Sequence, residues 1–190
     1  MGTKFSTRIW VGVVGIASIF WGSKGYADTV VSVADFGLKP DTRENAVAYV
    51  QKAIEACRGK EPVTLVFPEG RYDFWPQYAH EKNYYETNTY DVFPKRLAML
   101  FEGLHNITVD GNGSQFVMHD RIQTITVENC DGVTLKNFSI DWDIPLTAQA
   151  RVIKVGSDFF EIEINVLESP YIIEDGKLVF VGEGLSLIHI

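Results

Sequence analysis

Cysteine is scarce in this 190-residue sequence, which contains only Cys57 and Cys130. Two cysteines form at most one disulfide, which excludes a fold held together mainly by disulfide bonds. The burial of apolar side chains must therefore stabilise the protein. Cys57 ends an apolar helical stripe and Cys130 lies in a turn between two expected strands, so we expect two buried free thiols in preference to one bridge.

Clusters of basic residues are also missing. The formal net charge is −8, and residues 1–27 contain Lys4, Arg8 and Lys24 but no acid, so residues 28–190 carry −8 − 3 = −11. Nucleic acids and anionic membranes are attracted by clustered Lys and Arg, and we expect neither as a partner. A neutral ligand such as a sugar is not repelled. The sequence has no phosphate-binding glycine loop, Cys/His metal pattern or EF-hand loop, so we expect no metal and no cofactor.

The longest apolar run covers residues 9–22, between basic residues and the small-residue site Gly25-Tyr26-Ala27. It is shorter than the roughly 20 residues that cross a bilayer comfortably. This pattern predicts a secretory signal peptide that is cleaved after Ala27, with a retained membrane anchor as the alternative. We therefore expect a secreted or periplasmic protein that is free of the membrane after cleavage.

Short apolar segments at 30–33, 63–67 and 71–74 predict three strands around one helix. Asp41 and Glu44 form the pattern of a capping box and predict the start of that helix. The apolar face of this helix has helical spacing and consists of Val47, Val50, Ile54 and Cys57. Gly59 follows at the expected end of the helix. We expect about four helical turns that cover the exposed edge of the first strands.

A near-repeat follows in the middle of the sequence. Residues 98–102 and 107–111 return as residues 124–128 and 133–137, at one offset (124 − 98 = 133 − 107 = 26). Short strands at a fixed offset, separated by Asn and Gly, predict a solenoid and specifically a parallel β-helix. Two coils are fewer than the three or more that a stable solenoid needs, so we expect the front portion of a longer protein.

The pattern changes in the last third. Residues 149–155 and 159–166 alternate apolar and polar side chains, and residues 177–181 form another short apolar segment, which predicts a series of antiparallel hairpins. We therefore divide the sequence into the signal peptide (1–27), the N-terminal part of a β-helix (28–148), an antiparallel β insertion (149–184) and a non-native or truncated tail (185–190).

Three stretches carry a family resemblance: Val33-Ala34-Asp35-Phe36-Gly37, residues 51–54 and residues 66–72. They resemble the first coil of pectin-lyase-like right-handed β-helix enzymes. Residues 109–113 and 137–143 resemble more narrowly the secreted α-galactosidases of glycoside hydrolase family 110. The resemblance implies an inserted β-barrel that begins near residue 151. It also implies an exo-acting enzyme that removes terminal α-1,3-linked galactose from glycans, branched as in blood group B or linear, with inversion and without a cofactor.

Inverting glycosidases need an acid and a base about 6.5–9.5 Å apart. On a strand, Asp141 and Asp143 point to one side and Trp142 to the other. These residues are candidates for binding sugar hydroxyls, and solvated carboxylates at a strand end are the alternative. Parallel side chains cannot approach a glycosidic bond from two faces, so we do not expect them to be the catalytic pair. The resemblance places the catalytic carboxylates beyond Ile190.

Trp75 is a further candidate for sugar binding, because aromatic rings stack on the apolar faces of sugars. Trp75 belongs to an aromatic-rich stretch whose rings could equally pack against the first coils. The other aromatic residues of this stretch are Tyr72, Phe74, Tyr78, Tyr84, Tyr85, Tyr90 and Phe93. His119-Asp120-Arg121 has the composition of a proton-handling group, but we interpret it as a polar corner.

Two other functions stay open at this point. One is a pectinase or polysaccharide lyase, although an acidic chain is poorly suited to an acidic polysaccharide. The other is a non-catalytic solenoid that binds glycans. We expect residues 28–190 alone to be inactive. The sequence does not decide between branched and linear galactosides, and it does not give the oligomeric state.

Overall fold

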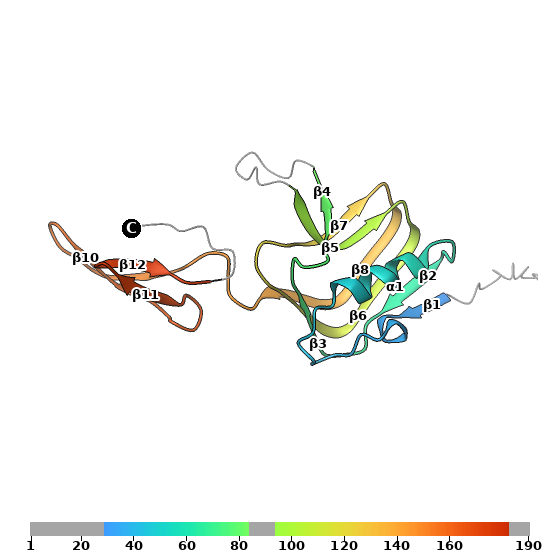
Figure 1. Cartoon of the computed structure of the whole chain (residues 1–190), viewed down its shortest axis with the longest axis horizontal. Coiled ribbons are helices and arrows are strands. Elements are labelled where there is room, and N and C mark those ends of the chain that lie inside the picture. The colour runs from blue at the N-terminus through green and yellow to red at the C-terminus, as the bar shows by residue number, and fades with distance from the viewer. Residues whose placement is uncertain (1–28, 84–93, 183–190) are drawn as a thin grey trace, which may run out of the picture.

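The computed structural model describes residues 29–83 and 94–182, which are mostly β-strand (Figure 1). The expected signal peptide, the expected tail and the aromatic residues Tyr84, Tyr85, Tyr90 and Phe93 lie outside these ranges. Within them, no helix has both the length and the apolar character needed to cross a membrane. The elements in chain order are β1 (Thr29–Ser32), η1 (Val33–Phe36), α1 (Val47–Cys57), β2 (Val63–Val66), β3 (Arg71–Phe74), β4 (His80–Lys82), β5 (Lys95–Glu102), β6 (His105–Met118), β7 (Gln123–Glu128), β8 (Asp131–Trp142), β9 (Arg151–Val155), β10 (Phe160–Glu163), β11 (Tyr171–Glu174) and β12 (Lys177–Phe180).

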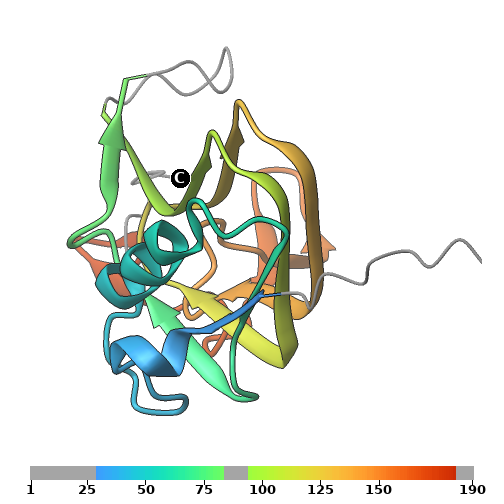
Figure 2. The ribbon, with the colours of Figure 1, turned by 90° about the vertical axis from the view of Figure 1, so that its right-hand side faces the viewer.

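Two sheets built mainly from parallel strands enclose the core. In the larger sheet β1, β2 and β6 are neighbours, and β6 also pairs with β3 and β8, all in parallel. In the smaller sheet β5 pairs with β7 in parallel and with β4 in antiparallel orientation. The chain passes alternately through the two sheets from β5 to β8 (Figure 2). Side chains from both sheets are fully buried between them, among them Leu65, Phe67, Met99, Phe101 and Phe116.

The repeat at offset 26 is confirmed as strand pairing in both sheets. Met99 pairs with Ile125 and Ile107 pairs with Val133 (125 − 99 = 133 − 107 = 26). The register changes beyond Asp110, because Ser114 pairs with Phe138 (138 − 114 = 24). Strand β6 therefore contains two more residues at its bend than β8 does, which the sequence repeat did not reveal.

Gly111 lies at this bend and touches the neighbouring strand closely. A Cβ atom at Gly111 would lie 2.5 Å from Cβ of Phe138 and 2.7 Å from the carbonyl oxygen of Asn137. Both atoms are fixed by the β6–β8 ladder and cannot move aside like the end of a flexible side chain. The pairing of β6 with β8 therefore requires glycine at this position.

We expect Gly111→Ala to lower the free energy of unfolding by about 1–3 kcal/mol, because overpacking of this size forces a backbone shift. In a domain of this size each kcal/mol lowers Tm by about 2–4 °C, which thermal denaturation followed by circular dichroism can measure. Gln115→Ala, at an exposed position of the same strand, is the control and should change the free energy of unfolding little. Equal losses of unfolding free energy in the two variants would show that contact with β8 does not restrict the side chain at position 111.

Helix α1 confirms the predicted apolar stripe but not the predicted start. Val47, Val50, Ile54 and Cys57 are buried, and the helix packs against β1, β2 and β5, across the end of the core. The helix has 11 residues, about three turns instead of four.

The predicted capping box of Asp41 and Glu44 is wrong. The carboxylate of Asp41 instead accepts a hydrogen bond from the backbone N–H of Arg71 (2.9 Å), and the N–H of Glu44 donates to the Thr42 hydroxyl (3.3 Å). Asn45 accepts from the N–H of Val47 (3.1 Å) at the true helix start. Asp41 therefore ties the segment before the helix to β3.

Both cysteines are free, as predicted. Cys57 is buried as expected, and burial raises the pKa of its thiol to about 11. Cys130 is only half-buried, which differs from the prediction, and its Sγ accepts a hydrogen bond from the N–H of Leu104 (3.4 Å).

The last four described strands form antiparallel hairpins, as predicted. Strand β9 pairs with β10 and β11 pairs with β12, each as a separate two-stranded sheet. Figure 1 shows both hairpins projecting away from the parallel sheets. The strands in residues 151–180 do not close into a barrel. Apolar side chains remain exposed on them, such as Val155 (75 %) and Ile173 (65 %).

Candidate functional site

The predicted sugar-binding residues Asp141, Trp142 and Asp143 lie at the end of β8, with Asp143 just after the strand. Trp142 pairs with buried Met118 and packs against the core, and its indole N–H donates to the carbonyl oxygen of Asp120 (3.3 Å). The side chain of Asp141 accepts a hydrogen bond from the N–H of Trp142 (2.8 Å). Asp143, in contrast, takes part in a network that spans three strands.

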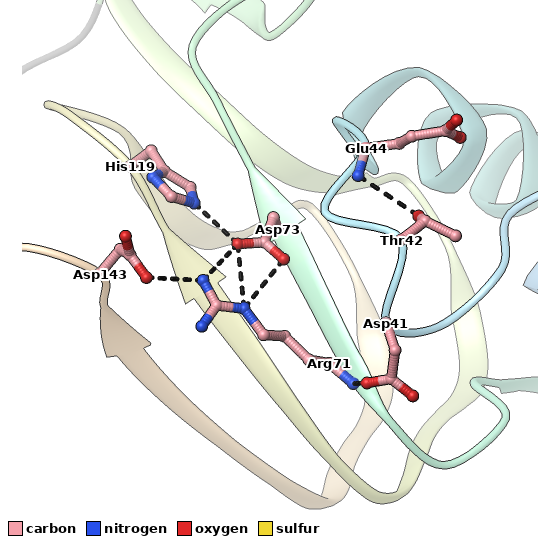
Figure 3. A network of polar contacts seen from close by, with 7 residues as sticks. All are labelled: Asp41, Thr42, Glu44, Arg71, Asp73, His119 and Asp143. Carbon is pink, nitrogen blue, oxygen red and sulfur yellow. Dashed lines mark hydrogen bonds and ion pairs between the residues drawn. The ribbon is translucent and has the colours of Figure 1, made fainter.

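We call this network the Arg71 cluster and define it as Arg71, Asp73, Trp75, His119 and Asp143. Arg71 and Asp73 belong to β3 and Trp75 follows it, while His119 follows β6 and Asp143 follows β8. Because β3, β6 and β8 are parallel neighbours, their carboxyl ends meet at one edge of the sheet. Figure 3 shows the guanidinium of Arg71 between the carboxylates of Asp73 and Asp143, with His119 beyond Asp73.

Asp73 is the centre of the cluster, and its side chain is fully buried. Nε of Arg71 donates to both carboxylate oxygens (3.1 and 3.0 Å), and Nη2 donates to Oδ1 (2.6 Å). Nε2 of His119 lies 2.8 Å from the same Oδ1. Burial alone would raise the pKa of Asp73, but the hydrogen bonds and charges of Arg71 and His119 outweigh it and hold the pKa below its ordinary value. Asp73 is therefore a permanent anion at neutral pH.

Arg71 also connects β3 with the end of β8. Its Nη2 lies 2.6 Å from Oδ1 of Asp143, whose side chain is 33 % exposed. The hydrogen bond to Asp73 raises the pKa of the guanidinium. Burial lowers this pKa, but the hydrogen bond to Asp143 and the charges of both carboxylates raise it further, so the net shift is upward. The pair joins residues that are 72 positions apart in the sequence.

Trp75 stacks on His119 with ring centroids 3.8 Å apart and an interplanar angle of 9°. The backbone of Trp75 is held by Asn45, whose Oδ1 accepts from its N–H (3.3 Å). Of the other described aromatic residues in this stretch, Tyr72 and Phe74 belong to the core, and Tyr78 is exposed. For Tyr72 and Phe74 the packing alternative is therefore correct.

The sequence offered one signal for Arg71 and Asp73 that our prediction missed. Alternate residues on a strand share a face, and Arg71 and Asp73 flank Tyr72 in a strand whose apolar residues enter the core. Two charged residues on one face of a short strand could have indicated a polar cluster there.

In residues 29–83 and 94–182, no group of three or more His, Cys, Asp or Glu side chains is arranged to hold a metal ion. A polar hollow of about 460 Å³ lies separately, at the base of the β9–β10 hairpin, and includes Gln149, Arg151 and Glu168.

We expect Asp73→Asn to lower the free energy of unfolding by about 1.5–3 kcal/mol near neutral pH, because the half-buried guanidinium of Arg71 loses its hydrogen bonds to a buried carboxylate and keeps only Asp143 as a charged partner. The pKa of Asp73 is lowered on folding, so its contribution is complete above the unfolded-state pKa of about 3.9 and is lost as the pH falls through the folded-state value.

Urea unfolding of both proteins between pH 7 and pH 2 tests this, and the difference between them should stay constant down to about pH 4 and shrink below it. Asp131→Asn, at an exposed carboxylate at the start of β8, is the control. A difference that stays constant with pH would contradict the ionic role of Asp73.

No protein-family profile matches the sequence. Comparison with curated proteins does find relatives. The chain is 60 % identical over 158 residues to α-1,3-galactosidase B of Bacteroides thetaiotaomicron, which is 83 % of this chain and 26 % of that protein. It is 37 % identical over 157 residues to α-1,3-galactosidase A of Shewanella woodyi, covering 82 % of this chain and 26 % of that protein. It is 35 % identical over 182 residues to an α-1,3-galactosidase B of Phocaeicola vulgatus, covering 94 % and 29 %.

The chain thus spans about a quarter of the length of these curated relatives. The matched part is their N-terminal portion, and the identity extends over most of the present sequence. The resemblance to galactosidases that residues 109–113 and 137–143 indicated is confirmed. The chain is therefore homologous to the N-terminal portion of the α-1,3-galactosidases.

Proposed function

We propose that this chain is the N-terminal part of a secreted exo-α-1,3-galactosidase that hydrolyses terminal α-1,3-linked galactose from glycans, with inversion and without a cofactor. The observation that carries the proposal is the 60 % identity to an α-1,3-galactosidase over 158 residues. At this level of identity the folds are closely similar. The two carboxylates of the inverting reaction would come from polypeptide outside these 190 residues.

The electrostatics of the described residues support this division. An inverting glycosidase needs one carboxyl group that stays protonated near neutral pH, which requires a raised pKa. The pKa values of Asp73, Glu102 and Asp110 are all lowered, each by hydrogen bonds from neighbouring side chains. Asp73 and Asp143 also share one guanidinium and do not face each other across an open gap. The Arg71 cluster is therefore suited to binding and not to proton donation.

We further propose that residues 28–148 form the first coils of a right-handed parallel β-helix, that residues 149–184 begin an inserted β-barrel and that residues 185–190 are a non-native or truncated tail. The uncovered inner face of β7 and β8 supports the first of these assignments. Val127 and Leu135 pair with buried Phe101 and Val109, yet they are 46 % and 39 % exposed. A further coil would cover these side chains.

A chimera tests the activity. Residues 29–182 replace the homologous segment of α-1,3-galactosidase B from Bacteroides thetaiotaomicron, and release of galactose from an α-1,3-galactoside is measured against the parent enzyme. Because 60 % identity preserves most packing contacts, we expect kcat/KM within about tenfold of the parent. A control chimera with Gly111→Ala should fold less stably.

The same assay includes polygalacturonate as a rival substrate. A folded chimera that cleaves polygalacturonate and not the galactoside would support a pectinase or lyase. A folded chimera that binds galactosides without cleaving them would support a non-catalytic glycan-binding function. Either result would contradict the proposal.

The cellular location of the protein is a separate proposal. We propose export through the signal peptide, with cleavage after Ala27. Expression of the complete sequence in a bacterial host should give a secreted or periplasmic protein that starts at Asp28, as N-terminal sequencing would show. Ala27→Arg should block processing, because signal peptidase requires a small residue there. A mature protein that still starts at Met1 would show a retained anchor.

A further inference from the structure

Two polar groups of the Arg71 cluster remain available at the surface. In the described part of the chain, Arg71 uses its side-chain atoms Nε and Nη2 for hydrogen bonds, and the carboxylate of Asp143 uses Oδ1. The guanidinium Nη1 and the carboxylate Oδ2 are left over. The two side chains are 23 % and 33 % exposed, so solvent reaches the pair.

Buried groups hold Arg71 and Asp143 in place. Asp73, which is fully buried, fixes the guanidinium through three contacts, and Nε2 of His119 lies within hydrogen-bond distance of Oδ1 of the same carboxylate. The backbone N–H of Asp143 donates to the carbonyl oxygen of Met118 (3.1 Å) and continues the ladder between β6 and β8. Neither group must be ordered when a ligand binds, which reduces the entropy lost on binding.

We propose that Arg71 and Asp143 form a binding subsite for two adjacent hydroxyl groups of a neutral sugar. A hydroxyl group is both donor and acceptor, so one hydroxyl accepts from Nη1 of Arg71 and its neighbour donates to Oδ2 of Asp143. Hydrogen bonds to charged groups are stronger than those between neutral groups. This inference rests on the proposed function, which makes galactose the sugar to test first.

The charges favour a neutral ligand over an anion. Arg71 alone would attract carboxylates, but Asp143 lies 2.6 Å from it and repels them. Asp73 neutralises the guanidinium further from beneath. Galacturonate should therefore bind more weakly than galactose at this site, although the two sugars have the same arrangement of ring hydroxyls.

Asp143→Asn tests the subsite. The amide oxygen can still accept from Arg71, while the charge at Oδ2 is lost. We expect the affinity of the 190-residue chain for galactose, measured by NMR titration, to fall about tenfold, as for the loss of a hydrogen bond to a charged group. The preference for galactose over galacturonate should shrink or reverse, because the repelling charge is gone. A residue that only stabilises the fold would not move this preference.

Asp131→Asn removes a charge from the start of the same strand and should leave both affinities unchanged. Arg71→Lys is a second variant, because lysine can still pair with Asp73 but lacks Nη1, and it should weaken galactose binding without reversing the preference. Thermal denaturation of every variant shows whether it is folded. Absence of galactose binding by the wild-type chain, or wild-type affinity in folded Asp143→Asn, would overturn the inference.

The outcome is separable from that of the chimera. If the chimera releases galactose while Asp143→Asn binds galactose normally, the subsite fails and the proposed function stands. If the chimera is inactive while the chain binds galactose in a manner that depends on Asp143, the subsite stands without the proposed activity.

Discussion

The pairing of β6 on both of its edges is the constraint on which the described structure depends. β6 joins β2 and β3 on one edge and β8 on the other, so it links the first strands of the chain to the repeat. A parallel strand satisfies its backbone and buries its side chains only between such neighbours. Ile107, Val109 and Phe116 on β6 are fully buried for this reason, whereas their partners on β8 remain partly exposed.

The bend of β6 determines where the residues of the Arg71 cluster lie. The carboxylate of Asp110 accepts hydrogen bonds from the N–H of Asn112 (3.0 Å) and from Nδ2 of Asn137 (2.9 Å), so the corners of β6 and β8 are bonded to each other. The close contact at Gly111 fixes their separation. Beyond this bend the strands run in a register that brings Met118 opposite Trp142. His119 and Asp143 therefore follow their strands side by side, within reach of Arg71.

Local patterns in the sequence predicted the local structure well. The apolar stripe of the helix, the short strands around Leu65 and the offset of 26 each follow from a periodicity that neighbouring residues share. The capping box failed because Asp41 and Glu44 satisfied a local rule while a backbone group of β3, 30 residues away, offered Asp41 a better partner. Asp143 was a candidate from its strand position, but its pairing with Arg71 left no trace in the sequence, since no local spacing encodes a contact over 72 residues.

The charges in the Arg71 cluster limit the chemical roles that its residues can have. A carboxylate whose pKa is lowered by Arg71 and His119 stays ionised over the whole neutral range, so Asp73 cannot exchange protons with a leaving group. The same ionisation makes it a permanent anchor for the guanidinium, which in turn orients Asp143. Charges fixed in this way orient a polar ligand without taking part in its chemistry. A protein that separates these tasks can keep its binding carboxylates ionised while another carboxyl group, in a different environment, retains the proton that glycosidic cleavage requires.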